Sequence, residues 1–413
     1  MTSAKVDAVV VGGGPNGLSA AIALAQGGRS VLVLEAQDHL GGAVATAELT
    51  LPGFHHDVFS SVYPAGAASP VFAKLPLERH GLRWVQPEIP MAHPLDDGRA
   101  IALMRDVDAT AATLDAVHPG DGAAWRELAG PYVKHFEALR ATMLAGFPPV
   151  TGPTRLLAAL KLGGTLDFVQ LLLSSAHALG GRLFEDAGAR GWLYGSAMHG
   201  DVPPTNAGSA ISGVYLKVLG HAVGWPSPEG GAGRLTDALA GVLRAHGGET
   251  RTGARVARVL TQRNRVSGVR TDGGDVVQAR IVVCDTTPRG LLALAQDALP
   301  DAYVRRLLAF RYGPSTVKLD WALDGPVPWT ASLPRTAGTV HVGGTADEIT
   351  DALAASEAGR LPERPFLLFG QQSVADPTRA PAGKHTAWAY THVPRGVDWA
   401  REREPFTARG TWV

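Results

Sequence analysis

The stretch that decides the fold lies at the N-terminus, where residues 6–46 read VDAVVVGGGPNGLSAAIALAQGGRSVLVLEAQDHLGGAVAT. The apolar run that ends at Val11 predicts a first strand, and apolar residues at helical spacing after Pro15 predict a helix that ends at Gly27-Gly28. Residues Ser30 to Leu34 form a second short apolar run. The stretch therefore predicts a strand, turn, helix and strand, with parallel strands and a right-handed crossover.

Three glycines in the first turn form a GxGxxG pattern. Gly12 is expected to make the tight turn, Gly14 to let a pyrophosphate approach the backbone, and Gly17 to let the helix pack against the strand. The helix that starts with Pro15 and Asn16 would then present unpaired N–H groups and the positive end of its dipole to the phosphates. In this context the pattern predicts a dinucleotide-binding site.

An acidic residue, Glu35, ends the second predicted strand. About 20 residues after the first glycine, an acid in this position can accept hydrogen bonds from ribose hydroxyls. Its negative charge would repel a 2′-phosphate, which disfavours NADP. The alternative is a glycine-rich turn followed by an unrelated acid, but the succession of strand, turn, helix and acid favours the nucleotide site.

A second glycine pair, Gly41-Gly42, follows Glu35 and Ala36. Such a pair permits another close approach of the backbone to a long, extended cofactor. This favours FAD over NAD, which share the adenine, ribose and pyrophosphate bound by the first pattern. Taken alone, the pair is equally consistent with an ordinary turn.

The N-terminal stretch resembles the FAD-binding segment of the phytoene desaturase and flavin amine oxidase superfamily. It is similar in particular to the bacterial phytoene dehydrogenase-like oxidoreductases related to pyridine nucleotide-disulphide oxidoreductase domain-containing protein 2. The resemblance runs to about Asp398, and its further matches are Pro52-Gly53-Phe54 with Asp57, Gly224-Trp225-Pro226, Gly230-Gly231 and Gly247-Gly248.

This resemblance implies an α/β fold class, with a Rossmann-like FAD-binding domain interleaved with an α+β substrate domain. It also implies that backbone groups of the strand around Val256 hold the adenine. The residues expected to bind FAD are Gly12, Gly14, Pro15, Asn16, Gly17, Glu35, Ala36, Gly41, Gly42 and Val256.

The domain boundaries are expected at two Pro-rich breaks, Phe147 to Pro153 and Trp225 to Gly231. The expected division is an FAD-binding domain of residues 1–75 and 226–300, and a C-terminally truncated substrate domain of residues 76–225 and 301–413.

Within the second part of the FAD-binding domain, helical spacing from Leu235 ends at Gly247-Gly248. Three runs rich in β-branched residues follow, at 256–260, 266–271 and 276–283. Polar turns separate them, so they predict an antiparallel meander.

Two departures from the resemblance concern the flavin. Many flavin amine oxidases carry Arg directly after the glycine pair, whereas this sequence has Ala43, which weakens an amine oxidase assignment. Members of the superfamily also close the flavin site with a C-terminal glycine-rich segment leading into a helix, and no such segment is found before Val413. The alternative to an active enzyme is therefore a catalytically impaired or non-catalytic nucleotide-binding remnant or regulatory protein.

The composition restricts the partners. The chain has 38 Lys+Arg and 38 Asp+Glu, so its formal net charge is zero and no nucleic-acid partner is expected. The one cysteine, Cys284, excludes an internal disulfide or a redox dithiol and fits a reducing, cytoplasmic location. Because one dinucleotide pattern is present, the flavin is expected to pass electrons to oxygen, a quinone or another carrier.

The most apolar internal stretch, Leu156 to Phe184, is interrupted by Lys161, Asp167 and Arg182. No transmembrane segment is predicted, because about 18 uncharged residues in a row are lacking. We interpret the stretch as a buried core helix. Contact with a membrane surface or the wall of an apolar tunnel is the alternative.

The sequence does not identify a catalytic residue. His55-His56-Asp57 and Met198-His199-Gly200-Asp201 are His/Asp clusters that can face the flavin, although structural hydrogen bonding is favoured for both. Adjacent histidines point to different sides of a strand, so no metal site is predicted. Side chains that can wall an apolar pocket, with core packing as the alternative, are Trp192, Tyr194, Tyr215 and Trp225.

The expected function is an FAD-dependent oxidoreductase that transfers a hydride from a C–C or C–N bond of an apolar small molecule to the flavin. An NAD-dependent dehydrogenase ranks lower, because Gly41-Gly42 and the downstream matches favour FAD.

Overall fold

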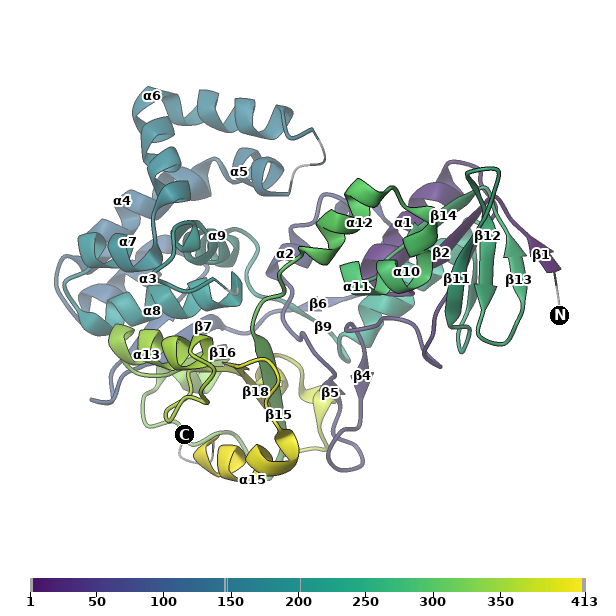
Figure 1. Ribbon diagram of the computed structural model, residues 1–413. Coiled ribbons are helices and arrows are strands. Elements are labelled where there is room, and N and C mark those ends of the chain that lie inside the picture. Colours follow the sequence, from purple (N-terminus) through teal and green to yellow (C-terminus); the bar gives the residue numbers. More distant parts are fainter. Residues whose placement is uncertain (1–2, 145, 147, 201, 411–413) are drawn as a thin grey trace.

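A parallel four-stranded sheet of order β10-β3-β2-β14 lies in the half of the molecule that contains the N-terminus (Figure 1). The computed structural model describes residues 3–144, 146, 148–200 and 202–410, so Phe147, Asp201 and residues 411–413 lie outside the described residues. The strands are β2 (Ala8–Val11), β3 (Val31–Leu34), β10 (Glu249–Arg251) and β14 (Ile281–Cys284).

Helix α1 (Pro15–Gln26) connects β2 to the parallel strand β3. Both strands are wholly buried, which explains why their sequences are continuous apolar runs rather than alternating patterns. Leu18 and Ile22 of α1 pack in the same core as Val10 and Val33. The predicted strand, turn, helix and strand are therefore confirmed.

A second sheet, of order β1-β13-β12-β11, lies beside the first. Its strands are β1 (Ser3–Lys5), β11 (Val256–Gln262), β12 (Arg265–Thr271) and β13 (Val276–Gln278). The predicted meander is wrong in its third strand, because the run 276–283 is divided between two sheets. The first part pairs antiparallel with β12, whereas β14 pairs parallel with β2. Both parts are apolar because residues of each pack in the same hydrophobic core, although they pair with strands of different sheets.

The other half of the molecule contains a six-stranded sheet of order β15-β18-β17-β16-β7-β8. Its strands are β7 (Ile89–Pro94), β8 (Ala100–Leu103), β15 (Ser315–Leu323), β16 (Ala337–Val342), β17 (Leu367–Gly370) and β18 (His385–Val393). The pairs are antiparallel except for β16 and β7, which run parallel. This sheet thus joins a hairpin from the first third of the chain to strands from the last third.

A layer of helices covers part of this sheet (Figure 1). The helices are α3 (Val107–Asp115), α4 (Asp121–Lys134), α5 (Phe136–Met143), α6 (Thr151–Leu173), α7 (Ala176–Leu183), α8 (Ala187–Ala197), η3 (Met198–Gly200), α9 (Ser209–Ala222) and α13 (Ala346–Glu357). Trp125 and Trp192 are fully buried at the centre of this layer, where they meet edge to face.

Helix α6 is largely exposed, so its interpretation as a buried core helix is wrong. It projects from the helical layer at the top of Figure 1. Its most apolar 18-residue window is only 17% buried, and by length and composition it is the one helix among the described residues that could cross a membrane. Leu156, Phe168 and Leu171 pack inward, whereas Leu162, at 78% exposed, does not. The helix is apolar on its exposed face as well as on its buried face, so the apolar sequence did not show how little of it is buried.

The remaining elements connect the sheets. A short hairpin pairs β4 (Thr46–Ala47) with β5 (His56–Asp57), and a separate antiparallel pair joins β6 (Trp84–Val85) to β9 (Ser227–Pro228), which lies far along the chain. The helices are α2 (Pro64–Ala67), α10 (Gly233–Ala245), α11 (Pro288–Ala295), α12 (Asp301–Leu308), α14 (Gln372–Ala375) and α15 (Trp399–Gly410). The short 3₁₀ turns are η1 (Phe72–Lys74), η2 (Leu77–His80), η4 (Gln296–Ala298), η5 (Leu333–Thr336) and η6 (Pro377–Arg379).

The strands divide by sequence position. Those of the parallel sheet and its neighbour fall within residues 3–34 and 249–284, and those of the six-stranded sheet fall within 89–103 and 315–393. The α/β fold class is confirmed. The assignment of cofactor and substrate to separate domains stays a prediction.

Candidate functional site

The turn between β2 and α1 has no room for side chains. Gly12 has a positive φ of 106°, and a Cβ there would lie 2.6 Å from the carbonyl oxygen of Asp285. A Cβ on Gly17 would lie 2.2 Å from the carbonyl oxygen of Gly12. Gly14 differs, because its φ of −70° suits any residue and the nearest atom to an added Cβ is a carboxylate oxygen at 3.2 Å. Gly12 and Gly17 are thus required by the fold, whereas an added Cβ on Gly14 would only press against the Asp285 carboxylate.

The second glycine pair lies directly beside this turn. Gly41 N–H donates to the carbonyl oxygen of Gly13 at 2.9 Å, and a Cβ on Gly42 would lie 3.8 Å from the Cα of Gly14. Both residues of the pair have positive φ. Thr236 of α10 closes the other side, since its hydroxyl donates to the carbonyl oxygen of Val44 at 2.6 Å. The structure therefore brings together two glycine segments that the sequence separates.

Glu35 is turned toward the glycine turn. Its carboxylate accepts hydrogen bonds from the N–H of Gly13 at 2.7 Å and of Gln37 at 2.9 Å, and it is 8% exposed. Its backbone carbonyl accepts from Ala254 N–H, two residues before Val256 at the start of β11. Ala36 follows it, partly exposed. The acid, the glycine turn and the start of β11 therefore lie in one neighbourhood.

Asp285 is a site residue that the sequence interpretation missed. It follows β14, and its Oδ2 accepts the N–H of Gly17 at 2.8 Å. A carboxylate thus binds the first turn of α1, where unpaired N–H groups attract negative charge. The sequence does show an acid directly after an apolar strand. Such an acid is a candidate for the site, because the carboxyl ends of parallel strands lie at the same edge of the sheet.

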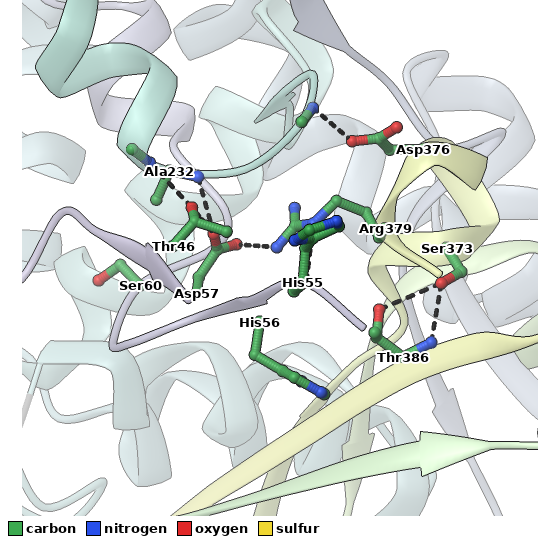
Figure 2. A network of polar contacts seen from close by, with 12 residues as sticks. Thr46, His55, His56, Asp57, Ser60, Ala232, Ser373, Asp376, Arg379 and Thr386 are labelled. Atoms are coloured by element: carbon green, nitrogen blue, oxygen red, sulfur yellow. Dashed lines mark hydrogen bonds and ion pairs between the residues drawn. The ribbon is translucent and has the colours of Figure 1, made fainter. Parts of the chain in front are cut away.

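A buried ion pair joins the β4–β5 hairpin to the segment after α14 (Figure 2). Arg379 Nη2 lies 2.7 Å from Asp57 Oδ2, and the two side chains are 1% and 0% exposed. The other Asp57 oxygen accepts from the Thr46 hydroxyl at 2.8 Å and from Ala232 N–H at 2.7 Å. Asp376 accepts from Gly230 N–H in the same turn before α10. These contacts fix the start of α10 against both halves of the molecule.

The adjacent histidines of the β4–β5 hairpin lie in different environments. His55 lines a cavity of about 590 Å³, and its carbonyl oxygen accepts from Arg379 Nε at 3.0 Å. His56 is 2% exposed and points away from the ion pair in Figure 2. Its Nε2 bonds the Thr50 hydroxyl at 2.8 Å, and its Nδ1 lies 3.4 Å from Asp320 of β15. The two rings therefore share no ligand position.

Val58 lines two cavities. The first, which His55 lines, reaches from Leu40 and Ala45 beside the second glycine pair. We call the second, of about 690 Å³, the sheet cavity. The sheet cavity is lined by Val58, Phe59, Ser60, Ser61, Val62, Tyr63, Pro64, Ala65, Gly66, His199, Leu216, Trp225, Thr316, Lys318, Asp320, Thr339, Trp388 and Tyr390.

The sheet cavity combines apolar and aromatic walls with a few polar groups. Trp388 and Tyr390 stack nearly parallel, with ring centroids 5.8 Å apart. Lys318 forms an ion pair with Asp320, and burial lowers the pKa of Lys318 although the Asp320 carboxylate opposes this. Burial raises the pKa of Asp320, but hydrogen bonds from His56 and Lys318 outweigh it, so the net shift is downward.

The aromatic residues proposed from the sequence divide between wall and core. Among the residues described, Trp225 lines the sheet cavity, whereas Trp192 and Tyr194 are buried in the core of the helical layer and Tyr215 packs against that core. Sequence reasoning missed Lys318 and Asp320. Their signal is the alternation of polar residues at 316, 318 and 320 along one face of a strand.

Cys284 ends β14 and is partly buried, with its thiol free. Burial raises its pKa, so the thiol stays protonated and weakly reactive.

The arrangement of these elements occurs in known oxidoreductases. An oxidoreductase from Methanosarcina mazei has a TM-score of 0.64 at 20% identity, covering 98% of this chain and 83% of that chain. The chain thus shares the α/β fold of this oxidoreductase.

The sequence comparison goes further. The chain belongs to the family described as flavin containing amine oxidoreductase, whose model matches residues 16–405. It is 27% identical to pyridine nucleotide-disulfide oxidoreductase domain-containing protein 2 of Rattus norvegicus, over 94% of this chain and 73% of that protein. It is also 27% identical to a phytoene dehydrogenase of Streptomyces griseus, over 96% of this chain and 76% of that protein. The chain is an FAD-dependent oxidoreductase. The family match gives no support to the lower-ranked alternative, an NAD-dependent dehydrogenase.

The residues around the glycine turns fit FAD. Added Cβ atoms at Gly12, Gly17 and Gly41 would all collide with protein atoms, so none of these three positions can carry a side chain. The acidic side chain of Glu35 and the start of α1 adjoin it. Bound FAD supplies the hydride-accepting ring that protein side chains lack.

Proposed function

We propose that FAD lies extended along the two glycine turns and that an apolar small molecule is oxidised at a C–C or C–N bond in the sheet cavity. Gly12, Gly14, Pro15, Asn16 and Gly17 would face the pyrophosphate, and the further contacts would come from Glu35, Ala36, Gly41, Gly42 and Val256. The observation that supports this most is that Val58 lines both the cavity beside the second glycine pair and the sheet cavity. A long cofactor that starts at the glycine turns is thereby led toward the substrate.

The walls of the sheet cavity support an apolar substrate with aromatic or unsaturated character. Aromatic faces such as those of Trp225, Trp388 and Tyr390 favour flat apolar ligands. Lys318, held by Asp320, supplies a polar group that can orient the substrate or hold a proton at its Nζ. The segment from Phe59 to Gly66 forms another wall and would exclude water from the reacting bond.

The cofactor part is tested by the visible spectrum of the purified protein and by Gly14→Ala. The backbone conformation at Gly14 suits alanine, but the added methyl group would stand where the pyrophosphate is proposed to approach, so affinity for FAD should fall about 10-fold or more, as for a loss of 1.4 kcal/mol. Gly181→Ala is the matched control, since nothing lies within 4 Å of an added Cβ there. Equal affinity in both variants would contradict a cofactor at this turn.

The substrate part is tested by anaerobic mixing with aromatic amines and with unsaturated hydrocarbons. Bleaching of the flavin absorbance by either class would assign the bond that is oxidised. Lys318→Met should slow bleaching more than it alters FAD affinity. Failure of both classes to bleach a bound flavin would contradict an apolar substrate.

We propose that oxygen or a quinone reoxidises the flavin, and that the enzyme is cytoplasmic with a peripheral membrane contact through α6. The single dinucleotide pattern and the single cysteine support a small acceptor over a second nucleotide or a dithiol. Leu162, Leu166, Val169 and Leu173 support the membrane contact, because this spacing places four exposed apolar side chains on one stripe. An amphipathic surface of this kind can lie in a lipid interface.

A further inference from the structure

Two histidines connect the wall of the sheet cavity to the protein interior. His199 of η3 lines the cavity, and its Nε2 lies 3.0 Å from Nε2 of His341 on β16. His341 is fully buried. At this distance one nitrogen carries the hydrogen and the other accepts it. A proton can therefore pass between the cavity wall and the interior by a short shift along one hydrogen bond.

Helix α8 is shaped to admit the buried imidazoles. A Cβ on Gly195 would lie 2.6 Å from His341 Nδ1, and a Cβ on Gly191, one turn earlier, would lie 3.1 Å from Nε2 of His93. His93 is also fully buried, and its Nε2 donates to the carbonyl oxygen of Gly344 at 2.8 Å. Gly191 and Gly195, on one face of α8, thus leave space for the two buried imidazole rings, which a larger residue at either position would fill.

Lys217 of α9 completes the cluster. It is fully buried, its Nζ lies 3.3 Å above the ring of Trp192, and no described residue gives that nitrogen a hydrogen-bond partner. Burial lowers its pKa well below the ordinary value. A buried lysine without a carboxylate is less stable than a buried methionine, so packing does not account for it.

Burial lowers the pKa of each buried base in this cluster. Burial is the largest cause that lowers the pKa of His341, and the positive charges of His199, Lys217 and His93 lower it further. For His93, burial lowers the pKa to about 4, and Lys217 adds to this against the opposing Gly344 carbonyl. His221, on the same helix as Lys217, feels the same charge, and burial lowers its pKa to about 4. The described groups that act on His341 are all cationic when protonated, so the cluster can hold few protons at once.

We propose that His199 takes the proton released when substrate is oxidised, passes a proton to His341, and that Lys217 sets how readily His341 accepts it. This rests on the proposed function. The substrate loses a hydride to FAD and a proton from the adjacent N–H or C–H to His199, whose Nε2 proton moves to Nε2 of His341. When dioxygen or a quinone takes the electrons, the same proton returns and completes hydrogen peroxide or the hydroquinone. His199 is then a catalytic residue, and Lys217 is a positioning residue that acts through His341.

Flavin reoxidation tests the relay without a known substrate. Bound FAD is photoreduced anaerobically with EDTA and mixed with oxygenated buffer or a soluble quinone between about pH 5 and pH 8. His199→Gln should slow reoxidation about 100-fold. Lys217→Met removes a charge that lowers the pKa of His341, so the pH at which reoxidation begins to slow should move upward. His221→Gln is the matched control, because its ring is used by Trp125 and by the Arg105 carbonyl and lies off the path.

A second measurement does not depend on turnover. With lysine labelled at Cε, the Lys217 resonance should titrate well below the other lysines, and histidine ring signals should show His341 changing in Lys217→Met. Unchanged pH profiles in His199→Gln and Lys217→Met would overturn the relay while leaving the flavin assignment intact, as would ordinary titration of Lys217. Absence of bound flavin would overturn the proposed function instead.

Discussion

The glycine turns and the sheet cavity are assembled in opposite ways. The turns use backbone from a short stretch, residues 12–17 and 41–42, joined by the hydrogen bond from Gly41 to Gly13. The sheet cavity uses side chains from η3, α9, β15, β16 and β18, which are far apart in sequence. A backbone surface depends on where side chains are missing, whereas a side-chain cavity depends on packing between distant elements. Mutations should therefore act by obstruction in the first region and by loss of contacts in the second.

The largest effect is expected where the two regions are joined. Arg379→Met should lower the free energy of unfolding by about 3–5 kcal/mol, because Asp57 would remain as a buried charge without its partner. Urea unfolding measures this. The control is Arg83→Met, since Arg83 is 81% exposed and 3.9 Å from Glu229, and its loss should change stability by at most about 1 kcal/mol. Equal unfolding midpoints for the two variants would show that the ion pair of Arg379 and Asp57 contributes little to stability.

Acid should destabilise the sheet-cavity half through its buried histidines. Burial lowers the pKa of His93 to about 4, from an ordinary value of 6.5. Between these values the unfolded chain binds the proton and the folded chain does not, so stability falls as pH drops through this window. The loss of unfolding free energy caused by His93 alone reaches about 3 kcal/mol near pH 4.

His93→Gln should therefore flatten the fall in unfolding free energy between neutral pH and about pH 4.5. Urea unfolding at several pH values provides the slope. His39→Gln, at an exposed position in the turn before the second glycine pair, is the control and should leave the slope unchanged. A wild-type slope in His93→Gln would mean that this ring is not the neutral, buried group that its surroundings imply.

The glycine turn should respond to obstruction alone. Gly17→Ala places a methyl group 2.2 Å from the Gly12 carbonyl oxygen, so α1 must shift from β2. The expected loss is about 1–3 kcal/mol of stability, as for overpacking in general, together with weaker FAD binding. Gly14→Ala should weaken FAD binding without this loss of stability. Equal unfolding midpoints for the two variants would contradict the distinction between Gly17, which the fold requires, and Gly14, which it does not.

The difference between the regions also explains what the sequence could predict. The turn around Gly12 and Gly17 was predictable because each glycine has a local steric reason. Asp285 was not, because it contacts Gly17 from a position 268 residues away in the sequence. The division of 276–283 between two sheets was hidden by an apolar pattern that suits either neighbour. Lys318 and His341 were missed because their roles depend on which elements face them.

Helix α6 misled the sequence interpretation for a different reason, since an apolar stretch shows that water is avoided but not what replaces it. Leu162 and Leu166 are 78% and 62% exposed. The double variant Leu162→Ser/Leu166→Ser should change the free energy of unfolding by no more than about 0.5 kcal/mol, the smallest effect considered. It should nevertheless abolish sedimentation with vesicles of phosphatidylcholine and phosphatidylglycerol. Leu308→Ser, at an equally exposed leucine of α12, is the control and should sediment like the wild type. If the double variant unfolds much earlier, the stripe packs against protein, and if wild type stays in the supernatant at all lipid concentrations, the membrane contact is wrong.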